Sequence, residues 1–354
     1  MRVLAVHADE GGVGSYRMVF PVRALQGRGL DVTLDLKADK ITAYRDKDKR
    51  VVGVAPVKYD VVVFQIPVFK DYVDAIPFIQ AQGVAVVVEI DDDYWAIPHL
   101  NGARKFYYRG EGDYHVDNLW RAMELADMVT VSSTALHDLV PNKNKVVLPN
   151  MIPEWYLTAE VEKLPSDPFT ELVVGWTGNP ETHANDLEVM GNSLVRSIRK
   201  NKAHFLAIGS EETAGLVGFA DDESYWVGWT DLERYPRIVK NLDIGIVPLK
   251  QSRFNDSKSY LKGLEYAALG IPFIASPVRE YRNLARYDVG DLADHNWYGK
   301  LNTMLTSSLY REERAGRGKD FAELNTYELN CHLWWEAWKQ ATRNVKLRYN
   351  KDLK

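Results

Sequence analysis

Two lysines and a glutamate are closely spaced in residues 254–272 and could form one chemical surface. At about 100° per residue, a helix through this segment places Lys258, Lys262 and Glu265 within an arc of roughly 60°. The lysines favour a phosphate, whereas the glutamate repels a phosphate but suits sugar hydroxyls. This face therefore fits a ligand that carries both groups, such as a nucleotide diphosphate. The alternative is a solvated helix with an i,i+4 lysine pair and a counterion.

The predicted helix lies between two apolar segments that read as strands, residues 242–249 and 272–276, and it ends at Gly270. Ser257 and Ser259 flank Lys258 at its start, where free backbone N–H groups and the positive end of the helix dipole favour an anion. We therefore expect a strand–helix–strand unit whose helix start binds phosphate.

A glycine-rich loop, residues 11–17, follows the first predicted strand. Gly12 and Gly14 would let a ligand approach the backbone closely, and Arg17 would direct a positive charge into a cleft. The match to a dinucleotide fingerprint is weak because Arg17 stands where a third glycine is needed, although Asp35 falls where a ribose-binding acid would lie. The alternative is a tight strand-to-helix turn with a surface arginine.

Three consecutive aspartates, residues 91–93, close another apolar segment. At the carboxyl end of a parallel strand they could hold a divalent ion, or Asp92 and Asp93 could contact an acceptor hydroxyl. A helix N-cap followed by acidic residues is the structural alternative.

The second half of the chain repeats the strand-then-glycine pattern at residues 172–183. Gly178 and Asn179 could bring backbone N–H groups to a phosphate and His183 could touch it, although a lone loop histidine is more often incidental. The sequence contains no Ser-His-Asp order, HExxH motif or Walker loop.

The composition is that of an ordinary globular protein. The 354 residues are 46% hydrophobic and 26% charged, and the net charge of −5 gives no global attraction to nucleic acid or an anionic membrane. The single cysteine, Cys331, excludes an intramolecular disulfide and any multi-cysteine zinc site. No signal peptide or membrane-spanning run is evident, so we expect a soluble, cytoplasmic protein of unknown oligomeric state.

Apolar runs alternate with helix-period stretches, which indicates an α/β protein with parallel sheets. Besides the two strands above, these runs predict strands at residues 2–7, 31–36, 61–65, 85–90, 128–132, 146–148, 172–176, 205–208 and 225–227. We predict two doubly wound, Rossmann-like domains facing across a cleft, in residues 1–160 and 161–321, with a C-terminal helix at about 322–354 packing back on the first domain. Trp334, Trp335 and Trp338 lie on this helix, where core packing is favoured over binding a carbohydrate ring.

The chain resembles the GT-B glycosyltransferases of the family-4-like "glycosyl transferases group 1" type over nearly its whole length. The resemblance rests on the glycine loop with Arg17, on residues 148–150 and 175–178, and above all on residues 254–272, which include Asn255. It implies that Glu265 binds the nucleotide ribose and that basic residues hold the diphosphate. Two departures are that Ser257 replaces the first glutamate of the usual E-x7-E motif, and that no Arg and Lys pair follows Gly178.

The resemblance implies a retaining enzyme that moves a sugar from a UDP- or GDP-sugar to a hydroxyl group, with no obligatory metal or other cofactor. The candidate donor-binding residues are Gly12, Gly14, Arg17, Gly178, Asn179, His183, Asn255, Ser257, Lys258, Ser259, Lys262 and Glu265. The candidate catalytic residues are Lys258, Lys262, Asp92 and Asp93. The acceptor stays open among a glycan, a lipid-linked sugar, a protein side chain and a hydroxylated nucleobase. The alternatives are an NAD(P)-dependent oxidoreductase and a catalytically degenerate glycan- or nucleotide-sugar-binding protein.

Overall fold

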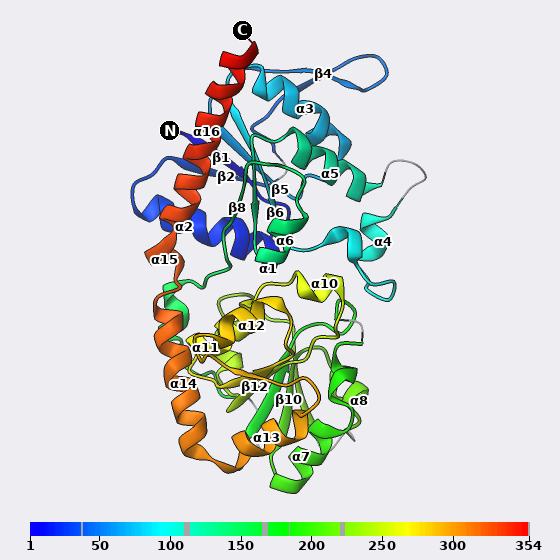
Figure 1. The fold of residues 1–354 in the computed structure, drawn as a ribbon, viewed down its shortest axis with the longest axis vertical. Helices are drawn as coiled ribbons and strands as arrows, with labels where there is room; N and C mark the ends of the chain where they lie inside the picture. Colours follow the sequence, from blue (N-terminus) through cyan, green and yellow to red (C-terminus); the bar gives the residue numbers. More distant parts are fainter. Residues whose placement is uncertain (37, 110–113, 165–168, 184, 220–223, 353–354) are drawn as a thin grey trace.

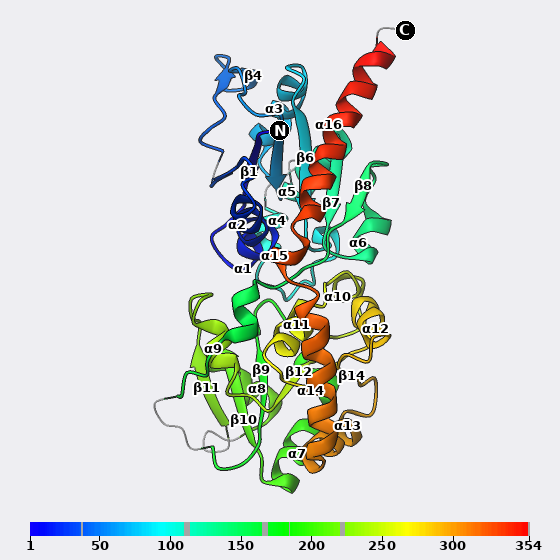
Figure 2. The ribbon, with the colours of Figure 1, turned by 90° about the vertical axis from the view of Figure 1, so that its left-hand side faces the viewer.

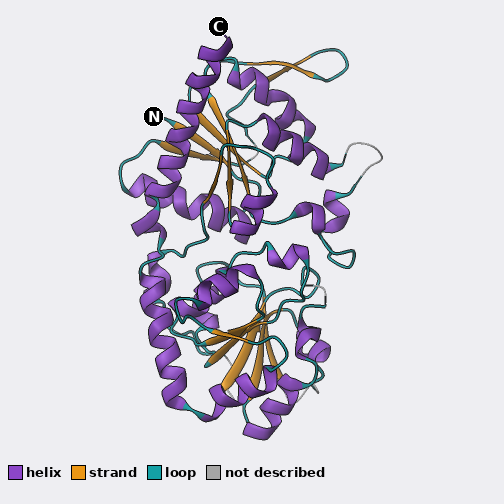
Figure 3. Ribbon diagram, viewed as in Figure 1, coloured by secondary structure: helices purple, strands orange, loops and turns teal. Residues whose placement is uncertain are grey.

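The computed structural model describes residues 1–36, 38–109, 114–164, 169–183, 185–219 and 224–352. These residues form two α/β units placed end to end, each built on a twisted sheet (Figure 1). The strands of both sheets are drawn in Figure 3, with helices covering them.

The first sheet has six parallel strands in the order β2-β1-β5-β6-β7-β8. The strands are β1 (Val3–Val6), β2 (Val32–Asp35), β5 (Val61–Gln65), β6 (Ala85–Ile90), β7 (Met128–Val131) and β8 (Lys145–Val147). The central strands are buried along their whole length, as valine-rich strands covered on both faces must be. Alternate residues face two separate cores: one includes α2 (Phe20–Gly27) and the C-terminal helix α16 (His332–Asp352), and the other includes α3 (Lys70–Gln80) and α5 (His115–Leu125).

The second sheet is also parallel, in the order β11-β10-β9-β12-β13-β14. Its strands are β9 (Val173–Thr177), β10 (His204–Gly209), β11 (Ser224–Gly228), β12 (Ile244–Val247), β13 (Phe273–Ala275) and β14 (Asp291–Leu292). One face packs on α7 (Ser193–Asn201) and α13 (Trp297–Thr306), and the other on α9 (Tyr235–Val239) and α11 (Leu261–Ala268). The strand order reverses between β9 and β12, which is the position where such sheets bind ligands.

The C-terminal helices connect the two units. Helix α14 (Ser308–Glu323) packs on α11 of the second unit, and after α15 (Tyr327–Asn330) helix α16 returns along β6 and β7 of the first (Figures 1 and 2). Trp334 and Trp338 are buried in the core, and Trp335 is partly buried. These three side chains therefore take the packing role that the sequence favoured.

The predicted strands agree with the structure to within two residues at every end. The hairpin of β3 (Ala43–Arg45) and β4 (Val51–Val54) and the short strand β14 were not predicted. Gly270 has φ of +72° directly after the last residues of α11, the left-handed conformation that a glycine adopts at a helix C-terminus.

The segment with the two lysines requires a correction. Instead of one helix, the chain forms α10 (Arg253–Asp256) and α11 (Leu261–Ala268), separated by residues 257–260. Ser252 caps the first helix by accepting from the Asn255 N–H, and the Ser257 hydroxyl turns back to the Phe254 carbonyl at 2.7 Å. Such local side-chain bonds compete with continued helix. Lys258 therefore lies in the connection, not on the face that carries Lys262 and Glu265.

The glycine loop after β1 forms a helical run of α1 (Gly12–Gly14) and a π-helical turn (Ser15–Val19) that leads into α2. The Asp9 carboxylate accepts from the N–H groups of Gly11 (2.7 Å) and Gly14 (3.1 Å). A Cβ at Gly14 would lie only 1.9 Å from the Asp9 carbonyl oxygen, whereas one at Gly12 would meet nothing within 4 Å. Close backbone approach, not a ligand, therefore requires glycine at position 14.

We expect Gly14→Ala to destabilise the protein by about 1–3 kcal/mol or more, because the loop must move away from Asp9. Gly12→Ala is the matched control: it adds a methyl group to open space and slightly raises helix propensity, so its stability should equal or exceed that of the wild type. Thermal unfolding followed by circular dichroism measures both. Equal midpoints for the two variants would contradict this account of the loop.

Candidate active site

A cavity of about 290 Å³ lies between the two units, at the carboxyl ends of their strands. The first unit lines it with the glycine loop and with residues that follow β6 and β8; the second contributes residues after β9, β11 and β12 and from α11. Of the predicted site residues, those that line the cavity are Gly12, Arg17, Asp92, Gly178, His183, Lys258, Ser259, Lys262 and Glu265. Those that do not are Gly14, Asp93, Asn179, Asn255 and Ser257.

Glu265 is buried at the centre of a cluster of tyrosines. The Tyr16 hydroxyl donates to its Oε1 atom, and the Tyr235 hydroxyl donates to Oε2 at 3.0 Å. Tyr156 lies behind Tyr16, with the two hydroxyl oxygens 2.5 Å apart. Burial raises the pKa of Glu265, while nearby Lys262 opposes this shift. The sequence placed Glu265 on a polar helix face but did not indicate these tyrosines, whose hydroxyls come from three separate segments.

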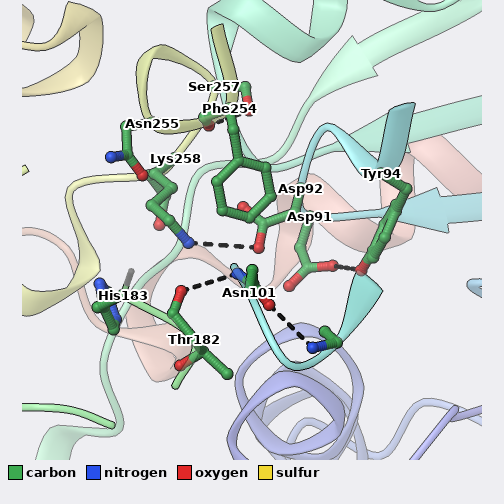
Figure 4. A network of polar contacts seen from close by, with 12 residues as sticks. Asp91, Asp92, Tyr94, Asn101, Thr182, His183, Phe254, Asn255, Ser257 and Lys258 are labelled. Atoms are coloured by element: carbon green, nitrogen blue, oxygen red, sulfur yellow. Dashed lines mark hydrogen bonds and ion pairs between the residues drawn. The ribbon is translucent and has the colours of Figure 1, made fainter. Parts of the chain in front are cut away.

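The two lysines face the cavity from different elements. Lys262 on α11 places Nζ 3.4 Å from the Thr177 hydroxyl oxygen at the end of β9, and burial lowers its pKa. Lys258 places Nζ 3.5 Å from Asp92 Oδ2, across the boundary between the two units (Figure 4). Its ammonium also lies 4.4 Å from the centre of the Phe254 ring. The second unit therefore presents two cations to one space.

Arg17 lines the cavity but is not a free cation, which corrects the sequence-based expectation. Its side chain is 1% exposed and forms an ion pair with Glu89 at 2.7 Å. The guanidinium also donates to the Leu148 carbonyl at 2.7 Å and to Asn150 Oδ1 at 2.8 Å. Arg17 therefore compensates a buried carboxylate and fixes the chain after β8, and all three of its partners belong to the first unit.

The three aspartates after β6 have three different partners. Asp93 is 1% exposed, forms an ion pair with Arg253 at 2.6 Å and does not line the cavity, so it is not an acceptor-side acid. Asp92 faces Lys258, and Asp91 accepts from the Tyr94 hydroxyl at 2.5 Å (Figure 4). Burial and the neighbouring Asp92 raise the pKa of Asp91 to about 7. Asp91, which the sequence-based selection omitted, thus joins Asp92 on the cavity wall.

His183 is held in place by a buried carboxylate. Its Nδ1 atom lies 3.0 Å from Asp186 Oδ2, and burial lowers the pKa of the imidazole to about 4. Asp186 also accepts from Asn255 Nδ2 at 2.6 Å and from the Lys250 N–H at 2.8 Å. The histidine is therefore neutral near pH 7, and Asn255 supports its partner instead of facing the cavity.

The remaining predicted residues have structural contacts. The carbonyl of Ser257 accepts from the Ser133 hydroxyl at 2.6 Å, and Asn179 Oδ1 accepts from the Glu181 N–H at 2.9 Å. Ser259 lines the cavity and its hydroxyl accepts from Asn150 Nδ2 at 2.7 Å. The Asp35 carboxylate, which a dinucleotide site would use for ribose, accepts from the Lys40 N–H at 2.9 Å and lies outside the cavity lining.

In the described part of the chain, no three or more His, Cys, Asp or Glu side chains gather in an arrangement that could hold a metal ion. None of the described helices combines the length and apolar character needed to cross a membrane.

Part of the chain is similar in sequence to a curated protein. No family model matches the chain. A Bacillus subtilis (strain 168) protein named "Putative teichuronic acid biosynthesis glycosyltransferase TuaH" is 27% identical over 169 residues, covering 44% of this chain and 42% of that protein. The match thus spans less than half the length of this relative.

Solved structures match over nearly the whole chain. Sucrose-phosphate synthase from Thermosynechococcus elongatus is similar with a TM-score of 0.61 and 15% identity, covering 96% of this chain and 99% of that one. Anabaena HepE, in complex with UDP and glucose, is similar with a TM-score of 0.62 and 11% identity, covering 95% of this chain and 98% of that one. OtsA is similar with a TM-score of 0.62 and 11% identity, covering 96% of this chain and 99% of that one. The chain has the GT-B fold. The predicted class, two doubly wound α/β domains facing across a cleft, is confirmed.

The raised pKa of Asp91 in this GT-B cleft predicts a pH-dependent stability. In the unfolded chain Asp91 has the ordinary carboxyl pKa of 3.8, and in the folded chain its pKa is about 7. At a pH between these two values, the folded state therefore binds more protons than the unfolded state does. The free energy of unfolding must then fall as pH rises through this window. Asp91→Asn removes the free-energy cost of ionising this carboxyl group in the folded state. We therefore expect the urea midpoint of the variant to rise relative to that of the wild type between about pH 5 and about pH 8.

Asp138→Asn is the control for this experiment, because the neighbouring Arg279 lowers the pKa of Asp138 and its titration lies below this range. A midpoint difference between Asp91→Asn and the wild type that stays constant with pH would show that Asp91 does not titrate there.

Proposed function

We propose that the protein is a glycosyltransferase that moves a sugar from a UDP-sugar to a hydroxyl acceptor in the interdomain cavity. The observation that carries this proposal is the pairing of Lys258 and Lys262 with the carboxylate of Glu265 on one wall of that cavity. The lysines suit a diphosphate, and the carboxylate suits ribose hydroxyls. The partial match to a protein named as a glycosyltransferase and the UDP and UDP-glucose complexes of the similar HepE support the same activity and donor.

The second domain would stabilise the leaving group. Breaking the bond between the anomeric carbon and the phosphate oxygen develops negative charge on the diphosphate, which Lys258 and Lys262 would offset. The Lys262 ammonium is partly buried and is held near the Thr177 hydroxyl, so its charge needs little reorganisation during the reaction. Gly178, directly after β9, lines the same wall, and glycine is needed there because a Cβ would lie 2.8 Å from the Trp176 ring.

The first domain would bind the acceptor. Asp91 and Asp92 line the opposite wall, where a carboxylate can accept a hydrogen bond from the attacking hydroxyl. Only 3.5 Å separates Asp92 from Lys258. The acceptor hydroxyl and the leaving phosphate would therefore meet on the same face of the sugar, which favours retention of the anomeric configuration. The acceptor oxygen then bonds to the anomeric carbon as the phosphate oxygen leaves and takes the proton.

Mass spectrometry of products from a panel of UDP- and GDP-sugars with glycan, lipid-linked, peptide and hydroxylated-nucleobase acceptors tests the activity. Sugar transfer in any pair supports it. If the protein binds the nucleotides but neither transfers nor hydrolyses a donor, it is a binding protein with a degenerate site. Hydride transfer with NAD(P) would establish the oxidoreductase alternative, which the position of Asp35 outside the cavity lining does not support.

We expect Lys262→Ala and Lys258→Ala to lower kcat/KM for transfer by roughly 30- to 1000-fold, since each removes a cation from the leaving group. Glu265→Gln should weaken donor binding while leaving neither tyrosine without a partner: the amide oxygen accepts from one hydroxyl and the amide nitrogen can donate to the other, whereas Glu265→Ala would leave both unpaired. Lys319→Ala, on the exposed side of α14, is the control and should behave as the wild type. Wild-type kinetics for both cavity lysine variants would reject this site.

We also propose that transfer needs no divalent metal. The aspartates after β6 already have partners: Asp93 has Arg253, Asp92 has Lys258, and Asp91 has the Tyr94 hydroxyl. In a metal-dependent site the ion is the main counter-charge of the diphosphate, whereas here lysines can take that role. Activity should therefore persist in excess EDTA. A complete loss that Mg²⁺ or Mn²⁺ restores would contradict metal independence.

A further inference from the structure

An open groove follows the boundary between the two domains, outside the cavity. It consists of three adjoining depressions of about 620, 400 and 410 Å³. The first and second share Leu139 and Arg253, and the second and third share Arg279. Its walls come from α5 and α6 (Thr134–Leu139) of the first domain and from α10 and α12 (Arg279–Ala285) of the second (Figure 1). The groove is therefore a joint product of both domains.

One end of the groove is basic. Arg279, Arg282 and Arg286 lie about one helical turn apart, on and just after α12, so their side chains share one face. They line the third depression, and no carboxylate is present among the described residues that line it. In the described part of the chain Arg279 pairs with Asp138 at 2.7 Å, whereas no ion pair involves the exposed Arg282 or Arg286. Two cations are thus available to an anionic ligand.

The other end of the groove is aromatic. Trp95 and Trp120 line it, both partly exposed, with ring centres 5.1 Å apart and ring planes nearly perpendicular. The apolar C–H face of a sugar ring packs well on such an indole surface. Arg121, Asp117 and Glu124 line the same depression, and their charged groups can bond to sugar hydroxyls. This end therefore suits the uncharged sugars of a glycan.

Polar contacts across the domain boundary hold the walls of the groove in place. Arg253 pairs with the buried Asp93 at 2.6 Å, and Arg279 pairs with Asp138 at 2.7 Å. The buried Glu280, next to Arg279, accepts from the first N–H of α6 at 2.8 Å. A groove that is formed before its ligand binds loses little conformational entropy on binding.

We propose that this groove binds an acidic polysaccharide, a glycan chain in which some of the sugars are uronic acids. The uncharged sugars pack at the tryptophan end, and the carboxylates pair with Arg282 and Arg286. Because Asp93 lines the groove and the preceding Asp92 lines the cavity, a polymer bound there is held close to the acceptor wall. The proposal goes beyond the transfer reaction and does not depend on it, since binding in the groove needs no donor.

A nucleic acid fits the groove less well than an acidic glycan does. It carries a phosphate on every nucleotide, so a strand that reaches both ends would also bring phosphates to Asp117 and Glu124, which repel them. The net charge of −5 opposes it further. A chain with a charge on only some of its sugars avoids this conflict.

Isothermal titration calorimetry of the full chain with a hyaluronan octasaccharide, in which every second sugar is a uronic acid, tests the groove. The control ligands are its carboxyl-reduced, uncharged derivative and a single-stranded thymidine oligonucleotide of the same number of units. We expect the octasaccharide to bind more tightly than either control. Its affinity should fall as salt is added, because ions screen the contacts between exposed charges.

Variants locate the binding in the groove. The double variant Arg282→Ala with Arg286→Ala should weaken octasaccharide binding by about 2- to 30-fold, because it removes two exposed cations. Trp120→Ala should weaken it by about 2- to 10-fold. The matched control is Arg23→Ala with Arg343→Ala, which removes the same charge from exposed positions on α2 and α16 outside the groove and should bind as the wild type does.

Circular dichroism shows whether Trp120→Ala folds. If it does not, Arg121→Ala at an exposed position of the same depression tests that end and should weaken binding by about 2- to 5-fold. No binding of the octasaccharide, or equal binding of the uncharged derivative, overturns the proposal. Wild-type affinity of the Arg282 and Arg286 double variant overturns it as well. Tighter binding of the oligonucleotide, lost in that variant, would make the groove a nucleic-acid site instead.

Discussion

The buried carboxylate of Glu265 is the group on which the arrangement of the cavity depends. A carboxylate removed from water costs several kcal/mol unless other groups compensate it. Here the compensation comes from Tyr16 of the first domain, from Tyr235 of the second, and from the nearby charge of Lys262. Because one of the donors belongs to the opposite domain, the hydrogen bonds that satisfy Glu265 also hold the two domains together at the floor of the cleft. The carboxylate is therefore both a candidate ligand contact and a structural connection.

A second connection explains how Lys258 is positioned. Helix α10, which belongs to the second domain by sequence, inserts Phe254 into a hydrophobic core of the first. Arg253 on the same helix pairs with the buried Asp93, again across the boundary. Lys258 follows two residues after this helix and lies over the Phe254 ring. Its distance from Asp92 is thus set by packing between the domains, so any opening of the cleft would separate the two charges.

Local features of this structure could be predicted from the sequence, whereas its long-range polar contacts could not. Strands β5 and β6 were predicted to the residue, because each contains a run of three valines and is bounded by a polar residue, Asp60 before β5 and Asp91 after β6. The role of Arg17 was not predicted, because its partner Glu89 lies 72 positions away and nothing near Arg17 indicates it. The same holds for Tyr16 and Tyr235, whose hydroxyls meet Glu265 only in the folded chain. Spacing along a helix could place Glu265 near a ligand but could not show that the group is buried.

The two walls of the cavity carry opposite charge, and this asymmetry gives the cleft a direction. A diphosphate is repelled by the Asp92 carboxylate and attracted by the lysines, so we expect the proposed donor to bind with its phosphates toward the second domain. Lys262 strengthens this preference: burial already lowers the pKa of its ammonium, and in the described structure its hydrogen-bond partner is a hydroxyl at 3.4 Å. A phosphate oxygen would add a negative charge to the one that the nearby Glu265 carboxylate already provides to this partly buried cation. The free-energy cost of partly desolvating the ammonium is already met when the chain folds. The attraction between the ammonium and the phosphate therefore contributes to donor binding. As negative charge grows on the leaving group, the same attraction stabilises the transition state.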